Sequence, residues 1–556
     1  MLSHSVGMTQ PSLLTGLIGD ALANAVAFWP DQDALVVRYQ GLRYTWRELA
    51  SEVDTIARAF LALGIQKGDR IGIWSPNCAE WCLTQLASAK VGAILVNINP
   101  AYRASELTYA LERSGCSWVV CADKFKASDY HAMLADVIPD VDCTAPGLWR
   151  CSELPELRGV ISLSSRPLVG MLAWGVVRNL GATITQNELE VRQSTLTAHD
   201  PINIQYTSGT TGLPKGATLS HHNILNNGFM VGHTLGLGFS DRVVIPVPLY
   251  HCFGMVMGNI ACLTHGATII YPSPSFEPLA TLQAVSEEKA TFLYGVPTMF
   301  IAELNVPELD LLNLSSLKGG IMAGSICPVE VMRQVVDQMH MAGVQIAYGM
   351  TETSPVSLQT SVADPIERRV ASVGRTQPHL EHKVINIAGE TVARGEVGEL
   401  CVKGYSVMLG YWQDPVATAH TIDSDGWMHS GDMVRMDDEG YVEVVGRSKE
   451  MIIRGGENIY PREIEELLLK HSLIAEAYVV GIPCSRLGEE LVAWVKVHKG
   501  QSLSPESLRE YCRTRIAHFK VPRHFTFVEE FPMTVTGKVQ KFRIREIAMA
   551  TLSRLD

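Results

Sequence analysis

The sequence lacks the patterns that mark disulfide scaffolds, zinc sites and cleavable leaders. Its 12 cysteines are scattered singly, with no C-x-x-C pair and no Cys/His cluster at zinc spacing. We therefore expect buried thiols in a reducing compartment. The first 37 residues contain no Lys or Arg, which argues against a secretory signal and a transit peptide. A cytoplasmic location is the resulting expectation.

Charge is scarce and mostly negative. Only 19% of the 556 residues are charged, and the net charge is −12. An acidic chain is a poor candidate for binding a nucleic-acid polymer. The end of the chain is different, because residues 509–545 hold nine Lys and Arg against three Asp and Glu. Such a basic segment could serve an anionic small ligand, and a chance imbalance of surface charge is the alternative that composition alone slightly favours.

The longest uncharged run, residues 243–276, has the length of a transmembrane candidate. Prolines, glycines and two histidines interrupt it, however. We therefore interpret it as a strand at 243–247, a loop, a buried helix at 254–263 and a strand at 267–271. A core segment beside a ligand pocket is favoured over a membrane span, and at most peripheral membrane contact is expected.

Helical and strand-like patterns alternate along the first half, which is typical of α/β layers with mainly parallel sheets. The helix predicted at 45–63 begins with a capping box, Thr45 followed by Glu48. Residues 143–187 are less regular and are interpreted as a surface insertion. The remaining early elements are helices at 78–91 and 104–114 and strands at 70–74, 93–97 and 118–122. After Glu399 the pattern becomes β-rich, and a compact unit of helices and strands follows Arg447.

Residues 206–216 read YTSGTTGLPKG, a segment dense in hydroxyls and glycines with one lysine. Glycine allows turns that aim backbone N–H groups at an anion, hydroxyls add donors, and Lys215 supplies a point charge for a polyphosphate. The segment is not a Walker A loop, because Pro214 stands where that motif requires glycine. It predicts a phosphate-binding loop.

This loop resembles the ATP loop of the adenylate-forming superfamily, which includes acyl-CoA synthetases, luciferases and peptide-synthetase adenylation domains. Companion motifs follow in the family's order: YGMTE at 348–352, HSGD at 429–432, GRSKEMIIRGGENIYPREIE at 446–465 and TGKVQK at 536–541. The resemblance covers about residues 20–550 and is closest to the medium-chain fatty acyl-CoA synthetase branch. It implies two α/β-layered subdomains plus a distorted β-barrel-like subdomain at about 370–447, together forming an N-terminal domain, 1–447. A small mobile α+β domain, 448–556, follows.

The resemblance implies an ATP-dependent acyl-CoA synthetase. A mainly apolar carboxylic acid would attack the α-phosphate of ATP, release pyrophosphate and form an acyl-adenylate, from which coenzyme A takes the acyl group. Positions matching the ATP contacts are Thr207, Ser208, Gly209, Thr210, Thr211, Gly212, Leu213, Pro214, Lys215, Ala323, Gly324, Ser325, Tyr348, Gly349, Met350, Thr351, Glu352, Asp432, Arg447 and Lys538. Glu352 and Thr207 would hold Mg²⁺, since this ion prefers hard oxygen ligands.

Catalysis would fall to Lys538, Thr351, His251 and Lys215. Lys538 would stand between the carboxylate and the α-phosphate, because two anions meeting in a dry site need a local cation. Lys449 matches the hinge about which the small domain turns between the two steps. Positions matching CoA contacts are Gly455, Gly456, Phe519, Lys520 and Arg523. The predicted acyl pocket consists of Met230, His251, Phe253, Met255, Val296 and Met299.

Several alternatives stay open. A branched, terpenoid, aromatic or thioether acid could replace a medium-chain fatty acid by the same mechanism. An amino-acid-activating domain is disfavoured, because the segment around His251 offers no carboxylate to a substrate ammonium. A membrane-associated fatty-acid transporter is the alternative from another class. The expected partners are ATP, CoA and the acid, and a homodimer is the expected assembly.

Overall fold

The computed structural model describes residues 1–138, 147–164, 166–207, 214–325, 327–455, 457–484, 486–533 and 539–552. These residues form two compact units. The large unit comprises Val6–Glu381 and Val402–Met428, and the small unit comprises the described parts of Met1–Ser5, His382–Cys401 and His429–Asp556. The chain therefore passes between the units more than once. The predicted domain boundary at residues 447/448 stays a prediction.

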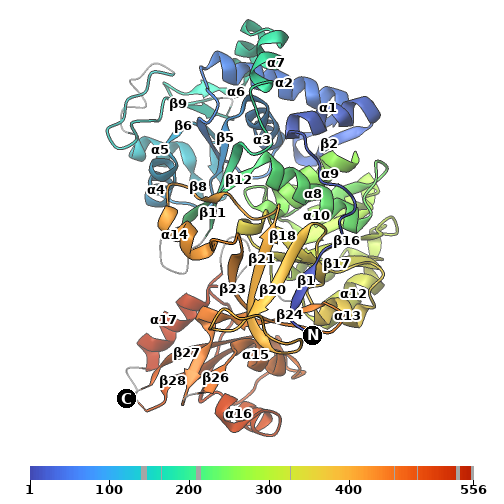
Figure 1. Ribbon diagram of the computed structural model, residues 1–556, viewed down its shortest axis with the longest axis vertical. Helices are drawn as coiled ribbons and strands as arrows, with labels where there is room; N and C mark the ends of the chain where they lie inside the picture. Colours follow the sequence, from blue (N-terminus) through green and yellow to red (C-terminus); the bar gives the residue numbers. More distant parts are fainter. Residues whose placement is uncertain are drawn as a thin grey trace. The chain divides into compact units, whose positions relative to one another are not determined.

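The large unit contains an eight-stranded sheet (Figure 1). Its order is β10 (Leu172–Ala173), β9 (Gly159–Ser162), β6 (Cys116–Cys121), β4 (Arg70–Trp74), β5 (Ile94–Asn97), β11 (Pro201–Thr207), β12 (Lys215–Ser220) and β22 (Gly410–Tyr411). Pairing is parallel from β10 to β11, and β12 and β22 are then added antiparallel. The helices of this region are α2 (Trp46–Ala62), α3 (Ala79–Val91), α4 (Ala104–Ser114), α5 (Tyr130–Val137), α6 (Trp174–Leu180) and α7 (Gln186–Gln193).

A nine-stranded sheet completes the large unit, with a parallel centre from β17 to β2 and antiparallel edges. Its order is β19 (Arg375–Thr376), β18 (Val356–Gln359), β17 (Gly343–Gly349), β16 (Gly319–Ala323), β15 (Phe292–Gly295), β13 (Arg242–Val244), β14 (Thr268–Tyr271), β2 (Asp33–Val37) and β3 (Leu42–Thr45). Its helices are α1 (Ile18–Phe28), α8 (His221–Leu235), α9 (Ala261–His265), α10 (Pro278–Glu288), α11 (Pro297–Leu304), α12 (Val329–Gln338) and α13 (Ile366–Ala371). The two α/β layers predicted from the sequence are confirmed.

A five-stranded sheet contributes most of its residues to the small unit, in the order β1 (His4–Val6), β20 (Leu380–Ile385), β21 (Val397–Gly404), β23 (Met428–Met436) and β24 (Val442–Arg447). Helix α14 (Pro415–Thr421) lies in the connection between β21 and β23, within the large unit. Among the described strands this sheet stays open at both edges, so the predicted barrel-like subdomain is an open sheet.

The second sheet of the small unit supports the predicted C-terminal unit of helices and strands. Its order is β26 (Glu457–Ile459), β25 (Ile452–Arg454), β28 (Gly488–Val497) and β27 (Ile474–Cys484), with β29 (His524–Phe527) also paired to β28. The accompanying helices are α15 (Pro461–Leu469), α16 (Pro505–Arg513) and α17 (Lys541–Leu552). Figure 1 shows β27, β28 and α17 in the orange-to-red part of the ribbon.

Local sequence signals place several elements correctly. Helix α2 begins after Thr45, whose hydroxyl accepts a hydrogen bond from the Glu48 N–H while the Glu48 carboxylate accepts one from the Thr45 N–H. This reciprocal capping satisfies two backbone donors that would otherwise lack partners. Strand β4 spans the residues predicted for it, 70–74. The predicted capping box and strand are therefore confirmed.

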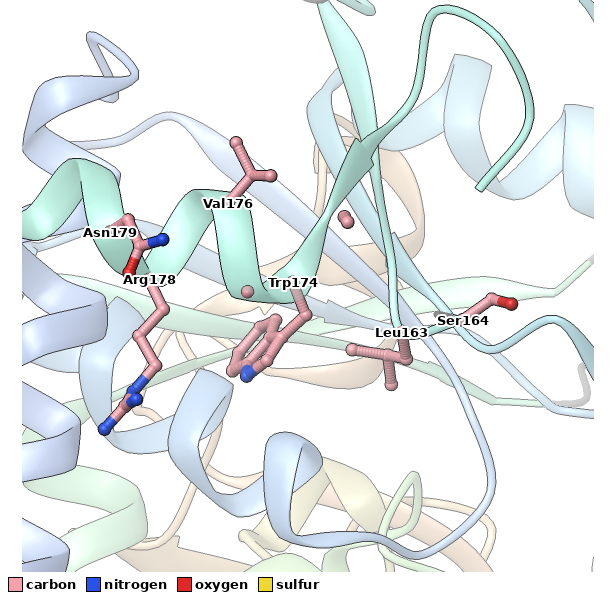
Figure 2. Close-up of a pocket in the computed structure, with 8 residues that line it drawn as sticks. Leu163, Ser164, Trp174, Val176, Arg178 and Asn179 are labelled. Atoms are coloured by element: carbon pink, nitrogen blue, oxygen red, sulfur yellow. The ribbon is translucent and has the colours of Figure 1, made fainter. Parts of the chain in front are cut away.

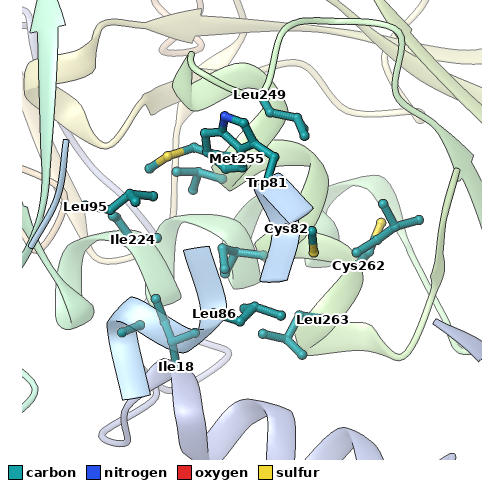
Figure 3. Close-up of a cluster of buried hydrophobic side chains, with 14 of the residues drawn as sticks. Ile18, Trp81, Cys82, Leu86, Leu95, Ile224, Leu249, Met255, Cys262 and Leu263 are labelled. Carbon is teal, nitrogen blue, oxygen red and sulfur yellow. The ribbon is translucent and has the colours of Figure 1, made fainter. Parts of the chain in front are cut away.

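The uncharged run 243–276 lies in the core of the large unit. Figure 3 shows Met255, Cys262 and Leu263 from this run among Trp81, Cys82 and Leu86 of α3. Its strand, β13, is shorter than predicted because Pro246 and Pro248 have no N–H to donate to the sheet. The predicted helix is a π-helical segment, η3 (Phe253–Ile260), continued by α9. No helix of the described residues is long and apolar enough to cross a membrane.

The interpretation of residues 143–187 as a surface insertion is wrong in one respect. Strand β9 lies inside that stretch, and its four residues are buried between β6 and β10. This strand is difficult to predict from the sequence, because it is only four residues long and follows the polar segment SELPELR. Residues 139–146 and 165 lie outside the described part of the chain.

Because His221 is buried, we expect the large unit to lose stability in acid. Its Nδ1 accepts a hydrogen bond from the Ile18 N–H at 3.3 Å, and burial lowers the pKa of the imidazole to about 4 from its ordinary 6.5. The unfolded chain therefore binds more protons between pH 6.5 and 4, so stability is complete above pH 6.5 and is lost as the pH falls through this window.

We expect His221→Gln to unfold with a flatter pH dependence than the native chain. As the pH falls, the free energy of unfolding of the native chain should decrease faster than that of the variant, by up to about 1.4 kcal/mol per pH unit. The reason is that glutamine keeps a hydrogen-bond acceptor but does not titrate. Urea unfolding between pH 4.5 and 7 measures this. The exposed His420→Gln is the control, and identical slopes for all three proteins would refute the assignment.

Candidate active site

The predicted phosphate loop begins and ends on two neighbouring strands of the large unit. Strands β11 and β12 are antiparallel, and their register places Thr207 opposite Lys215. The Thr207 hydroxyl lies 3.4 Å from the Lys215 carbonyl oxygen. The predicted ATP contacts Ser208, Gly209, Thr210, Thr211, Gly212 and Leu213 lie outside the described residues. The strand pairing therefore brings together the two ends of the predicted loop, Thr207 and Lys215.

Tyr411 connects this strand pair to the predicted metal ligand. Its hydroxyl donates a hydrogen bond of 2.7 Å to Oε1 of Glu352, and the Lys215 ammonium lies 5.0 Å from the centre of its ring. Strand β22 positions Tyr411 by pairing with β12, where Ala217 faces it. Burial, reinforced by the Glu352 charge, raises the pKa of Tyr411 well above its ordinary value. The phenol thus stays a hydrogen-bond donor at neutral pH.

Sequence reasoning missed Tyr411, because a tyrosine beside a tryptophan carries no charge or spacing signal of its own. We expect Tyr411→Phe to lower kcat/KM for MgATP about 10-fold and to raise the Mg²⁺ concentration needed for half-maximal rate. A hydrogen bond to a charged group contributes about 1.5–3 kcal/mol, and its loss frees the Glu352 carboxylate to turn. Initial rates across a Mg²⁺ titration measure both quantities.

Tyr39→Phe is the matched control, since it removes a hydroxyl that donates to the Asn77 carbonyl elsewhere in the large unit. A structural role alone for Tyr411 would lower stability and leave the Mg²⁺ dependence unchanged. That outcome would contradict the positioning role.

A cavity of about 590 Å³ opens beside Lys215 and Tyr411. It is lined by Tyr109, Glu112, Arg113, Tyr206, Pro214, Lys215, Gly216, Tyr411, Trp412, Gln413 and Asp414. A second cavity, shown in Figure 2, lies around Trp174 and contains no predicted site residue. Its Arg178 is paired with Glu52 at 2.5 Å. The first cavity is thus the one adjoining the phosphate loop.

The resemblance implies that Tyr348 stacks on adenine and that residues 323–325 form a backbone wall beside it, and these residues lie at the ends of two parallel strands. Ala323 is the last residue of β16 and pairs with Ala347 of β17, one residue before Tyr348. Gly324 follows with φ of +90°, a left-handed conformation that favours glycine. Ligands of parallel sheets bind at the carboxyl ends of the strands. The structure therefore brings the predicted backbone wall, residues 323–325, beside the predicted stacking ring.

Thr351 and Glu352 lie in the short helix η5 (Thr351–Thr353), half-buried after β17. Burial raises the pKa of Cys252 to about 12, and the neighbouring Glu352 charge acts in the same direction. The resemblance implies that His251 gates access to the acyl site. Because Cys252 is the next residue, this gate segment adjoins the predicted metal ligand.

Two buried amides hold the backbone next to His251. The Tyr250 carbonyl accepts hydrogen bonds from Asn97 Nδ2 at 3.1 Å and Gln205 Nε2 at 2.5 Å. The Tyr250 and His251 rings lie 4.4 Å apart. Strands β5 and β11, which supply the amides, therefore fix the start of the gate segment.

The predicted acyl-pocket residues separate into two groups. Phe253, Met255, Val296 and Met299 belong to or pack against one apolar cluster, and the Phe253 ring stacks on Tyr294 at 5.8 Å. Met230 lies in a different cluster with Leu380 and Tyr405. Four of the predicted apolar pocket residues thus share one large apolar cluster, whereas Met230 belongs to another.

In the small unit, Asp432 and Arg447 face each other across β23 and β24. The Arg447 Nε lies 3.2 Å from Asp432 Oδ1, with the carboxylate buried and the guanidinium largely exposed. The predicted turn at His429–Gly431 is part of strand β23, and Glu399 holds it, since its Oε1 accepts a hydrogen bond from the Gly431 N–H at 2.9 Å. The Ser430 hydroxyl donates to the Leu400 carbonyl at 2.7 Å. Asp432 and Arg447, which the resemblance implies as contacts of the ribose, are therefore paired on two neighbouring strands.

Some predicted CoA contacts have carboxylate partners. The Lys520 ammonium pairs with Glu463 at 2.6 Å, and Arg523 lies 3.9 Å from Glu490. Arg454 Nη1 donates to the Phe519 carbonyl at 2.8 Å. CoA would therefore compete with Glu463 and Glu490 for Lys520 and Arg523.

The remaining predicted positions of the small unit are partly outside the described residues. Gly455 has φ of +63°, as a close backbone approach would require. Lys449 is exposed in the short helix η6 (Ser448–Glu450). Gly456 and Lys538 lie outside the described residues.

Comparison with known proteins relates the chain to one enzyme family. The family described as AMP-binding enzyme matches residues 22–412, and the AMP-binding enzyme C-terminal domain matches residues 463–538. The chain is similar to "Medium-chain acyl-CoA ligase ACSF2, mitochondrial" of Rattus norvegicus, with 43% identity over 98% of this chain and 89% of the relative.

It is also similar to "Putative acyl-CoA synthetase YngI" of Bacillus subtilis (strain 168), with 44% identity over 97% and 99% of the two chains. Among solved structures, ATP-bound MatB from Rhodopseudomonas palustris matches with a TM-score of 0.82 and 26% identity, covering 96% of this chain and 99% of that one. The similarity in sequence and in fold thus spans nearly the whole chain.

Proposed function

The chain belongs to the family of AMP-binding enzymes and is an AMP-forming acyl-CoA synthetase, and from this premise we propose that it activates a medium-chain fatty acid. The observation that carries the proposal is the absence of charged residues from positions 243–276 together with the apolar cluster around Phe253 and Met255. Such a lining offers no partner for a second carboxylate or an ammonium, whose burial unpaired is costly. The medium-chain name of the mammalian relative supports the same substrate class.

In the first step the acid's carboxylate attacks the α-phosphate of ATP, and pyrophosphate leaves. We assign the triphosphate to the phosphate loop, with Lys215 and Thr207 at its ends. Glu352 and Thr207 offer the hard oxygen ligands that Mg²⁺ prefers, and this ion would neutralise charge on the phosphates. Thr351 would donate to the α-phosphate, and Tyr411 would orient the Glu352 carboxylate.

Asp432 would accept hydrogen bonds from the ribose hydroxyls, and Arg447 would hold the ribose or phosphate. Lys538 would stabilise the charge that develops between the carboxylate and the α-phosphate. In the second step the CoA thiol attacks the acyl carbonyl and AMP leaves. Lys449 would be the hinge between the steps.

A panel of acids tests the substrate proposal. Release of AMP in the presence of CoA is measured with butanoate, hexanoate, octanoate, decanoate and palmitate, and with branched, terpenoid, aromatic, dicarboxylic and amino acids. Each methylene that enters an apolar pocket contributes about 0.8 kcal/mol, so kcat/KM should rise about 4-fold per carbon until the pocket is full. We expect the maximum near octanoate. A maximum with an aromatic acid, a dicarboxylate or an amino acid would overturn the proposal.

A cytoplasmic location and a homodimer also stay proposals. Free thiols at all described cysteines support a reducing compartment. Fractionation in high salt and light scattering on the purified protein test the two proposals, with recovery in the supernatant and twice the chain mass as the expected results.

A further inference from the structure

Three side chains of different chemistry converge on one spot of the small unit, next to the segment that carries Asp432 but using none of the predicted ATP or CoA contacts. They are Glu399 and Cys401 of β21 and His429 of β23. One ligand atom from each lies within 4.8 Å of the other two. A carboxylate, a thiol and an imidazole form a donor set suited to Zn²⁺ and related thiophilic ions.

The distances match the spacing of ligands around a tetrahedral ion. Cys401 Sγ lies 3.6 Å from His429 Nδ1, which lies 3.3 Å from Glu399 Oε2. Around Zn²⁺, bond lengths of about 2.3 Å to sulfur and about 2.0–2.2 Å to nitrogen and oxygen separate the corresponding atoms by about 3.6 and 3.4 Å. Two of the three donor pairs therefore have the spacing of zinc ligands, and the third pair, Cys401 with Glu399, lies within 4.8 Å.

The strands hold these donors in place. Residues two apart on a strand point to the same face, which aligns Glu399 with Cys401, and β23 neighbours β21 in the sheet. Glu399 Oε1 is fixed by the Gly431 N–H at 2.9 Å, which directs Oε2 to the imidazole. Rigid strands are better supports for a metal site than loops are.

The site is also accessible. The side chains of His429 and Glu399 are 30% and 28% exposed, whereas Cys401 is buried at the base. Solvent can therefore deliver an ion past the two outer ligands and can supply water as a fourth ligand.

We propose that Glu399, Cys401 and His429 bind one thiophilic divalent cation such as Zn²⁺. Binding converts the Cys401 thiol to a thiolate and releases its proton to solvent, while His429 binds through neutral Nδ1. Affinity therefore rises with pH. The ion would connect β21 to β23 three residues before Asp432, and by binding the folded state it would stabilise the small unit.

Titration of the full-length, metal-free protein with Co²⁺ tests the proposal. We expect one equivalent to produce the visible bands of tetrahedral Co²⁺ together with a thiolate charge-transfer band in the near ultraviolet, and Zn²⁺ to displace both. Mg²⁺ should produce no change, because a hard ion does not favour thiolate. Zn²⁺ at 100 times its dissociation constant should shift the unfolding equilibrium of the small unit about 100-fold toward the folded state.

Cys401→Ser should abolish the charge-transfer band, and Cys484→Ser, which alters a half-buried thiol of the same unit, should keep it. His429→Asn tests a partly exposed ligand should the buried serine prevent folding. Loss of a residue that only hydrogen-bonds a metal ligand lowers metal affinity roughly 10- to 100-fold. Because His429 would bind the ion directly, His429→Asn should lower the Co²⁺ affinity by more than this. A charge-transfer band that survives in Cys401→Ser, or equal affinity in native and His429→Asn proteins, would overturn the proposal, as would the absence of a band in the native protein.

Discussion

Lys538→Ala is expected to lower the rate of acyl-adenylate formation by about 100- to 1000-fold while largely sparing the thioester step. Two anions, the carboxylate and the α-phosphate, must approach each other in a site with little water, where a single positioned donor contributes on this scale. Acid-dependent exchange of labelled pyrophosphate into ATP measures the first step. Preformed acyl-AMP mixed with CoA measures the second.

A matched control separates this role from a general effect of charge. Lys499→Ala removes an exposed lysine of the same small unit and should leave both steps unchanged. Lys541, three residues beyond Lys538, is itself paired with Glu465 and Glu450 at 2.8 and 3.0 Å and so has a structural role. Undiminished pyrophosphate exchange in Lys538→Ala would remove this lysine from the mechanism.

Glu352→Gln is expected to lower kcat/KM for MgATP by about 100- to 1000-fold. The amide preserves the shape of the side chain and an acceptor for the Tyr411 hydroxyl, but it removes the negative charge that favours Mg²⁺. The Mg²⁺ concentration for half-maximal rate should also rise, and a titration at fixed ATP measures it.

Glu308→Gln makes the same chemical change at an exposed position of the large unit and should leave activity intact. An unchanged Mg²⁺ requirement in Glu352→Gln would show that the carboxylate is not a metal ligand. Glu352→Gln should lower kcat/KM for MgATP more than Tyr411→Phe does, because the phenol only orients the charge that Glu352→Gln removes.

Elements with local signals could be predicted from the sequence. The capping box of α2 and the apolar run of β4 each specify their own boundaries, and the alternation of helices and strands indicates the layered α/β fold. Strand β9 was missed because four residues carry too little periodicity. Strand β13 is shortened by two prolines, which have no N–H to donate to a neighbouring strand.

The site residues could be predicted only where they belong to a motif of consecutive residues. The phosphate loop, YGMTE and HSGD are continuous, and the structure brings Thr207 opposite Lys215 and Asp432 opposite Arg447. Tyr411 could not be found in this way, because its contact with Glu352 arises when β22 pairs with β12. The Glu399, Cys401 and His429 cluster was missed for the same reason, since strand pairing joins residues distant in sequence.

Activation of the acid as an acyl-adenylate can be followed by the transfer of an oxygen isotope from the carboxylate. Octanoate labelled with ¹⁸O in both carboxylate oxygens is incubated with the enzyme, MgATP and CoA, and the masses of the products are measured by mass spectrometry. Attack of the carboxylate on the α-phosphate predicts one ¹⁸O in AMP and one in octanoyl-CoA. Label in inorganic phosphate, with ADP as the nucleotide product, would contradict the account.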